Sequence, residues 1–133
     1  MQRGLHIHPL AQSSDAGTLL AHQVLDDCVA VFPSFRRYWA ESGWYFHDKS
    51  GSYNACGVLL LLTWLLYERF NRVSDRQWHR LGALAKKYFD MGEPTRGVVG
   101  ACLIEPLEKK PYLRKMLRHW EREMLRHFTV VRA

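Results

Sequence analysis

The chain has 133 residues, of which 47% are hydrophobic and 24% are charged, a composition typical of one soluble domain. A chain of this length buries a core large enough to fold without disulfides or a structural metal, which excludes the disordered, collagenous and disulfide-scaffold classes. Its net charge is +6, from 19 lysines and arginines against 13 aspartates and glutamates. The longest apolar run is far shorter than the ~20 residues of a membrane span, so we expect no membrane partner.

Residues 1–14 show no helical or strand period and predict a flexible N-terminal arm, followed by a single helical domain over residues 15–133. The arm carries His6 and His8, which an extended backbone would place on one side, where they could bind a transition metal. In an unpatterned terminus we favour an incidental occurrence, and we expect no metal and no cofactor. The chain does not begin with an apolar signal segment, so we expect a cytoplasmic protein.

The first predicted helix runs from Asp15 to Phe32, where apolar residues recur every three or four positions. Pro33 ends or bends it, and aromatic residues at helical spacing predict a short second helix over Ser34–Glu41. The next stretch, Trp44–Tyr53, mixes aromatic residues with turn formers and predicts the main loop.

The stretch Asn54–Asn71 is apolar nearly all round, rich in leucine and too long for a typical strand, and its first residue is a competent N-cap. It predicts a helix in the middle of a bundle, with a buried strand at Val58–Leu62 as the alternative. A capping box, Ser74 with Gln77, then opens an amphipathic helix that ends at Gly92.

A second buried helix is predicted over Arg96–Leu107, and Pro111 opens a last helix with apolar residues on one face and cations on the other. Thr129–Val131 could pair as a terminal strand, but a lone strand has little support. Strand signals are otherwise nearly absent. The sequence therefore predicts an all-α fold, a single compact bundle of five or six helices.

The three cysteines, Cys28, Cys56 and Cys102, are far apart in sequence, and each has apolar neighbours. We expect each to be a small buried hydrophobic residue and not part of a disulfide framework or a reactive thiol. The usual local signatures of catalysis, nucleotide binding and metal binding are missing. We therefore predict no catalytic residue, with an enzyme whose site is assembled from several helices as an alternative.

The positive charge is concentrated near the C-terminus, where residues 109–133 hold eight cations and two carboxylates. Four of these cations, at helical spacing, predict one basic helix face: Lys115, Arg118, Arg122 and Arg126. Such a face could bind nucleic-acid phosphates, an anionic lipid surface or an acidic protein, or could simply be solvated. Against nucleic acid, the aromatic residues of this helix fall on its apolar face, where they could not stack on bases.

The predicted loop Trp44–Tyr53 is the second candidate surface, because aromatic and charged residues together are typical of protein recognition. Its candidate partner-binding residues are Trp44, Tyr45, His47 and Asp48. The alternative is that the loop's aromatic residues fold back onto the bundle as a lid.

Two apolar segments carry a family resemblance: Ala55–Val58, at the start of the central predicted helix, and Ala101–Leu107, before the last one. With the order of helices between them, they resemble the small helical immunity proteins of bacterial polymorphic toxin systems. The resemblance covers the chain from Phe32 to Leu125. It implies a cytoplasmic protein without catalysis of its own, which binds a cognate toxin and occludes its active surface.

Two features depart from that family. Immunity proteins against nucleases are commonly acidic, whereas this chain is basic, and the N-terminal arm has no counterpart. The basic charge implies a toxin domain with an acidic surface. We predict an immunity protein that uses the aromatic loop and the basic face, with a small basic nucleic-acid-binding or regulatory protein as the alternative.

Overall fold

The computed structural model describes residues 21–132, and within this range the chain is helical with no strand. In chain order the elements are α1 (Ala21–Val31), α2 (Phe35–Ser42), the 3₁₀ helix η2 (Gly43–Phe46), α3 (Ala55–Arg69), the 3₁₀ helix η3 (Phe70–Arg72), α4 (Asp75–Phe89), α5 (Thr95–Val99), the π-helical turn η4 (Gly100–Ile104), α6 (Glu105–Glu108), α7 (Pro111–Leu117) and α8 (Arg122–Arg132). The predicted arm 1–14, with His6 and His8, lies outside the described residues.

The all-α prediction is confirmed, but the described residues form seven helices where the sequence predicts five or six. Residues 21–132 form seven helices when α5, η4 and α6 count as one continuous helix. Neither predicted alternative for a strand forms, because Val58–Leu62 belongs to α3 and the backbone of residues 129–131 belongs to α8. No helix among the described residues reaches the length and apolar character that crossing a membrane requires.

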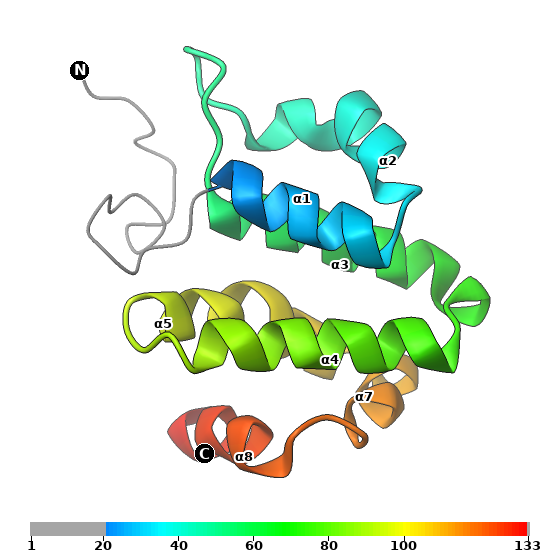
Figure 1. Ribbon diagram of the computed structural model, residues 1–133, viewed down its shortest axis with the longest axis vertical. Coiled ribbons are helices and arrows are strands. Elements are labelled where there is room, and N and C mark those ends of the chain that lie inside the picture. The colour runs from blue at the N-terminus through cyan, green and yellow to red at the C-terminus, as the bar shows by residue number, and fades with distance from the viewer. Residues whose placement is uncertain (1–20, 133) are drawn as a thin grey trace.

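Helix α3 lies in the centre of the bundle, as its apolar sequence predicts. Ten of its fifteen residues are buried. Asn54 caps it, because the side-chain oxygen accepts a hydrogen bond of 2.8 Å from the backbone N–H of Gly57. Figure 1 shows α1 and α2 on one side of α3, and α4 with the long helix (α5, η4 and α6 together) on the other, so neighbouring helices cover most of the surface of α3.

The predicted capping box at the start of α4 is confirmed. The Ser74 hydroxyl accepts from the backbone N–H of Gln77 at 3.1 Å, and the Gln77 side chain accepts from the backbone N–H of Ser74 at 3.0 Å. The helix ends at Phe89, earlier than the Gly92 that the sequence predicts. Gly92 has a φ of +79°, a left-handed conformation that turns the chain towards α5.

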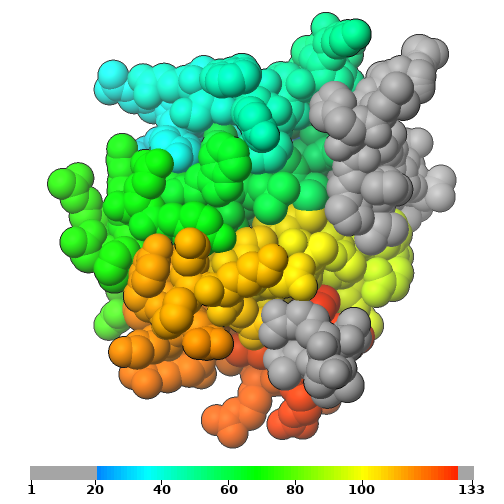
Figure 2. Space-filling view, turned by 180° about the vertical axis from the view of Figure 1, so that it is seen from behind, coloured from blue at the N-terminus to red at the C-terminus, as the bar shows by residue number. Residues whose placement is uncertain are grey.

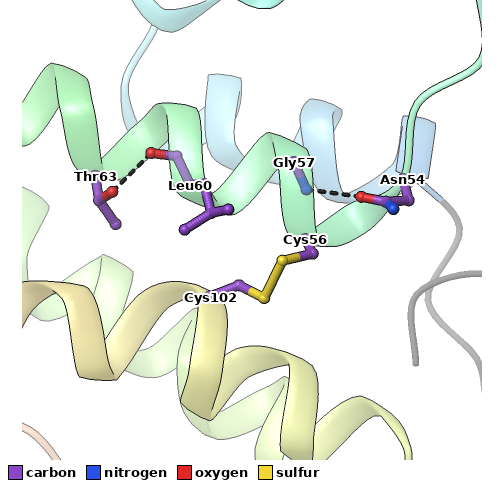
Figure 3. Close-up of a disulfide and its surroundings, with 6 residues drawn as sticks. All are labelled: Asn54, Cys56, Gly57, Leu60, Thr63 and Cys102. Carbon is purple, nitrogen blue, oxygen red and sulfur yellow. Dashed lines mark hydrogen bonds between the residues drawn. A yellow bond between two sulfur atoms is a disulfide. The ribbon is translucent and has the colours of Figure 1, made fainter. Parts of the chain in front are cut away.

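Cys56 and Cys102 are joined by a disulfide, which corrects the expectation of three unpaired cysteines. Cys56 is the second residue of α3 and Cys102 lies in the middle of η4, so the bond ties the central helix to the long one (Figure 3). Both cysteines are buried, as expected, but 46 residues separate them in sequence. Only the packing of the two helices brings them together, so the sequence pattern could not indicate the pair.

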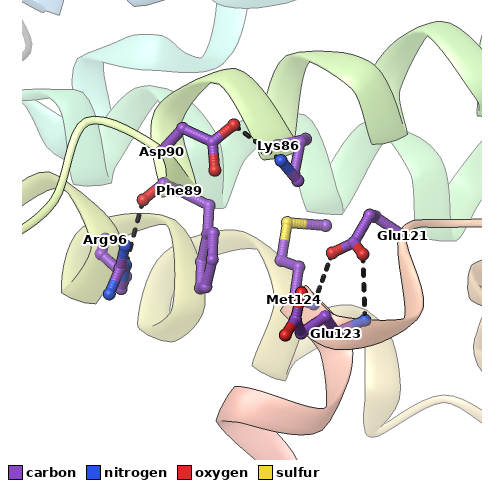
Figure 4. Close-up of polar contacts among 7 residues, drawn as sticks. All are labelled: Lys86, Phe89, Asp90, Arg96, Glu121, Glu123 and Met124. Carbon is purple, nitrogen blue, oxygen red and sulfur yellow. Dashed lines mark hydrogen bonds and ion pairs between the residues drawn. The ribbon is translucent and has the colours of Figure 1, made fainter.

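The single helix predicted after Pro111 is broken into α7 and α8, which accounts for the additional helix. Between them, the buried Trp120 indole donates a hydrogen bond of 3.0 Å to the carbonyl of Trp78 on α4. It lies so close to Gly82 that a Cβ there would be 2.6 Å from the indole ring. Glu121 then opens α8, because its carboxylate accepts from the backbone N–H of Met124 at 2.7 Å (Figure 4).

Polar contacts also fix the turn between α4 and the long helix. Lys86 and Asp90 form an ion pair of 2.7 Å on the surface of α4. The Arg96 guanidinium donates to the carbonyl of Phe89 at 3.0 Å and lies 4.2 Å from the centre of the Phe89 ring (Figure 4). These contacts hold the start of the long helix against the end of α4.

Candidate protein-binding surface

The most exposed large hydrophobic side chains of the described chain are Trp44 and Tyr45, with 72% and 61% of their surface accessible. Both follow α2 directly, in η2. The half-buried Phe46 and the exposed Trp64 of α3 lie beside them, and we call these four residues the aromatic surface. A fold hides such side chains from water where it can, so an exposed group of them marks a contact surface.

The four rings of the aromatic surface form one continuous cluster. Tyr45 lies edge-on to Trp44 and to Phe46, with ring centres 5.9 and 5.2 Å apart. Trp64 is 5.6 Å from Tyr45 and 5.2 Å from Phe46. Tilted and edge-on pairs at these distances are favourable aromatic contacts, so the rings hold one another in place.

The aromatic surface sits directly over the start of α3. A Cβ at Gly57 would lie 2.9 Å from the Cβ of Phe46, so only glycine lets η2 approach α3 this closely. The predicted lid is confirmed for Phe46, which packs against the core. It is wrong for Trp44, which remains exposed.

His47 and Asp48, two other predicted binding residues, shape the loop that follows. The Nδ1 atom of His47 lies 2.6 Å from the carbonyl oxygen of Gly43, and the half-buried imidazole packs between Trp39 and Tyr53. Asp48 Oδ1 accepts from the backbone N–H groups of Ser50 and Ser52 at 2.8 and 3.0 Å. The Asp48 contacts are those of an Asx turn, and the His47 contact ties this loop to Gly43, the first residue of η2.

The four predicted basic residues do not form one helix face, which corrects the sequence interpretation. Lys115 lies in α7, Arg118 follows its end, and Arg122 and Arg126 lie in α8. All four are exposed. The helix is interrupted between Arg118 and Arg122, so a spacing of three and four residues no longer places their side chains in line.

Phe70 and Tyr112 form a second exposed aromatic contact, which the sequence did not indicate. Phe70 is in η3, after the end of α3, and Tyr112 is in the first turn of α7. Their ring centres are 4.6 Å apart, and 39% and 38% of their surfaces are accessible. Arg69, Arg72, Lys109 and Lys110 lie within three residues of one ring or the other.

The remaining candidates for chemistry in the described residues are the free cysteine Cys28 and clusters of metal-ligating side chains. Cys28 is fully buried in α1, and burial followed by the neighbouring Asp27 raises the pKa of its thiol well above the usual range. The thiol is therefore protonated at neutral pH and unreactive. No group of three or more histidine, cysteine, aspartate or glutamate residues in this part of the chain could hold a metal ion.

Comparisons with family models, with curated proteins and with solved structures found no match. The resemblance to immunity proteins therefore remains a hypothesis that rests on the two apolar segments. The geometry of the exposed surfaces carries the functional argument.

Trp64 is the residue of the aromatic surface that sequence reasoning missed. It lies in α3, whose sequence is apolar on every side, so its pattern predicts no exposed position. Its neighbour Thr63 is buried, with a hydroxyl that donates to the carbonyl of Leu60 at 2.6 Å. In this helix, polarity and burial therefore do not correspond, and only the position of η2 identifies Trp64 as part of the surface.

Proposed function

We propose that this chain is a binding protein that acts as the immunity protein of a bacterial toxin, occluding the toxin's active surface with its aromatic surface. The observation that carries the proposal is the exposed ring cluster of Trp44, Tyr45 and Trp64. Tryptophan and tyrosine are the residues most enriched among those that dominate the energy of protein interfaces. The proposal assigns the chain no catalytic role and no cofactor.

The surroundings of the aromatic surface support a protein as the partner. Neither η2 nor residues 55–67 of α3 contain a lysine, arginine, aspartate or glutamate. The central part of a protein interface is similarly poor in charge and rich in aromatic residues. The rings are fixed by contacts to one another and to α3, so little side-chain entropy is lost on binding.

The excess positive charge indicates the charge of the proposed partner's surface. Residues 109–133 hold eight cations and two carboxylates, so a toxin domain with an acidic surface would be attracted to this end of the molecule. Helices α7 and α8 lie at the opposite end of the molecule from α2 (Figure 1), so Arg118, Arg122 and Arg126 would attract the partner from a distance and mainly change the rate of association.

A cytoplasmic location is part of the proposal, and the disulfide argues against it. Cytoplasmic thiols are kept reduced, whereas disulfides persist in oxidising compartments. Alkylation of intact cells followed by mass spectrometry decides the point for Cys56 and Cys102. Alkylated cysteines would support the cytoplasm, and a protected, bonded pair would place both the chain and its toxin in an oxidising compartment.

The experiment that tests the proposal is capture of a partner at unit stoichiometry. The tagged chain is expressed in its native host, washed with nuclease and with high salt, and the retained protein is identified. We expect a toxin domain encoded beside this chain, whose activity is lost on addition of one equivalent. Nucleic acid that is bound before the nuclease wash and lost with it, with no protein retained, or a toxin that stays active when bound, would contradict the proposal.

The matched variants are W44A/Y45A on the aromatic surface and Y112A on the second aromatic contact. We expect W44A/Y45A to weaken partner binding by about a hundredfold or more in titration calorimetry, because two central aromatic anchors are lost. Y112A removes an exposed aromatic side chain elsewhere, with 38% of its surface accessible, and should leave partner affinity unchanged. Equal losses in the two variants would show that the aromatic surface is not the interface.

A further inference from the structure

We propose that the surface around Phe70 and Tyr112 binds single-stranded nucleic acid, with the rings stacking on bases and the surrounding cations contacting phosphates. We call Phe70, Tyr112, Arg69, Arg72, Lys109 and Lys110 the basic aromatic surface. It involves none of the residues of the aromatic surface, so this inference is independent of the proposed toxin partner.

The first argument is the charge around the two rings. The segments 67–73 and 109–115 contain six cations and a single carboxylate, Glu68. That carboxylate accepts a hydrogen bond of 3.2 Å from the hydroxyl of Tyr38 on α2, so it is directed away from α7. The two segments lie side by side, because Phe70 packs on Tyr112, and Figure 2 shows the region of α7, in orange, below the end of α3, in green.

The second argument is that none of these cations forms an ion pair with a carboxylate that the structure describes. Among the side chains that the structure describes, the ion pairs are Arg37–Glu41, Lys86–Asp90 and Lys87–Asp27. None of them involves a cation of the basic aromatic surface. Lys110 lies 5.2 Å from the centre of the Tyr67 ring, which holds its ammonium group close to the two exposed rings.

The third argument is a hollow that two of these cations line. Arg69 and Arg72 line a hollow of about 150 Å³ together with Ser34, which is the N-cap of α2 but makes no capping hydrogen bond with its side chain. The other lining residues are Phe32, Leu65, Leu66, Val73 and Gln77. The end of α3 and η3 thus present two guanidinium groups to the hollow, while the Phe70 ring contacts Tyr112 of α7. Guanidinium groups bind phosphate through paired hydrogen bonds, and aromatic rings stack on any base.

The lysines favour nucleic acid over an acidic protein as the occupant. Lysine is depleted in protein interfaces, whereas flexible ammonium groups are common contacts to phosphates. Exposed rings interleaved with cations are the arrangement by which proteins bind single strands without sequence preference. A double helix would offer phosphates but no unstacked base for Phe70 and Tyr112.

The test is fluorescence anisotropy with a labelled oligothymidylate of about 12 nucleotides, a length within the usual range of single-strand sites. We expect binding whose affinity falls with salt, with a slope of log affinity against log salt of about −3, because four cations contact phosphates. R69E/R72E should reduce the magnitude of this slope by about half. A duplex of the same length should bind more weakly.

The ring contribution is measured with Y112A and Y112F. Loss of stacking should weaken binding by about tenfold in Y112A, and Y112F, which keeps the ring, should bind as the parent does. R122E/R126E, on α8, makes the same charge change as R69E/R72E away from the rings and controls for net charge. Circular dichroism of each variant shows whether it is folded.

Three results would overturn the inference. The first is that Y112A binds the oligonucleotide as tightly as the parent chain, and the second is that R122E/R126E costs as much affinity as R69E/R72E. The third is that polyglutamate displaces the oligonucleotide at equal charge concentration, which would make this an acceptor for acidic protein. W44A/Y45A should not change oligonucleotide affinity, so failure of the toxin proposal and failure of this inference are distinguishable.

Discussion

The aromatic surface and the basic aromatic surface both expose rings to water, but they differ in charge and in what supports them. The first lies over α3, in segments 43–46 and 55–67 that contain no charged residue, and rests on Gly57 beside the disulfide at Cys56. The second lies beyond the end of α3 and depends on α7, which the buried Trp120 follows. If the two proposals hold, the charge around exposed rings decides which class of partner they bind.

The largest expected effect is the loss of stability when the disulfide under the aromatic surface is removed. C56A/C102A is expected to lower the free energy of unfolding by about 3 to 4 kcal/mol, because the bond closes a loop with a sequence separation of 46 residues. Denaturant unfolding with and without reductant measures this. The control C28A also removes a buried sulfur but keeps the disulfide, so its stability should respond to reductant as that of the parent does, whereas C56A/C102A should not respond. A parent protein equally stable with and without reductant would contradict the prediction.

A smaller effect should come from loosening the support of the basic aromatic surface. In G82A the new methyl group meets the Trp120 ring, and we expect a net loss of about 1 kcal/mol in stability, because the clash exceeds the gain in helix propensity. Oligonucleotide affinity should fall more than partner affinity, since α7 is adjacent to Trp120.

The same substitution in a W120A background provides the control. Without the indole there is no clash, so G82A should there stabilise the protein by about 1 kcal/mol through helix propensity alone. Thermal unfolding of the parent, G82A, W120A and G82A/W120A gives the coupling free energy between positions 82 and 120. Destabilisation by G82A in both backgrounds would show that the Trp120 contact is not the cause.

The smallest effect should come from the separated cations of α7 and α8. R118E/R122E should weaken partner binding by about threefold to tenfold, mainly through the association rate, without unfolding the domain. Stopped-flow association at two salt concentrations measures it. R36E/R76E makes the same charge change at exposed positions on α2 and α4 and should have less effect. Unchanged affinity in R118E/R122E would show that these cations do not contribute to partner binding.

The sequence predicts those parts of the fold that depend on neighbours in the chain. The helices α3 and α4 are found because Asn54 and Ser74 cap them through residues three positions away. The break between α7 and α8 is missed because it depends on Trp120 packing against Gly82, a contact between distant segments. The disulfide is missed for the same reason.

The candidate site shows the same division. Trp44 and Tyr45 were predicted because they stand in a stretch without periodicity, and both are exposed. Trp64 and the Phe70–Tyr112 pair were not, since an apolar helix pattern predicts burial and a contact across 42 positions has no local signal. The predicted basic helix face is wrong because helical spacing places side chains in line only while the helix continues.

The π-helical turn Gly100–Ile104 determines where this helix can lose one residue. A π turn holds one residue more than an α turn, and the helical segments before and after it keep the same faces directed to the core. Deleting the exposed Ala101 would therefore leave a regular α-helix with Val98 and Leu107 still directed to the core. A deletion elsewhere in Thr95–Glu108 would rotate every later side chain by about 100°. Natural variants of this protein that differ by one residue in this helix should differ at the π turn.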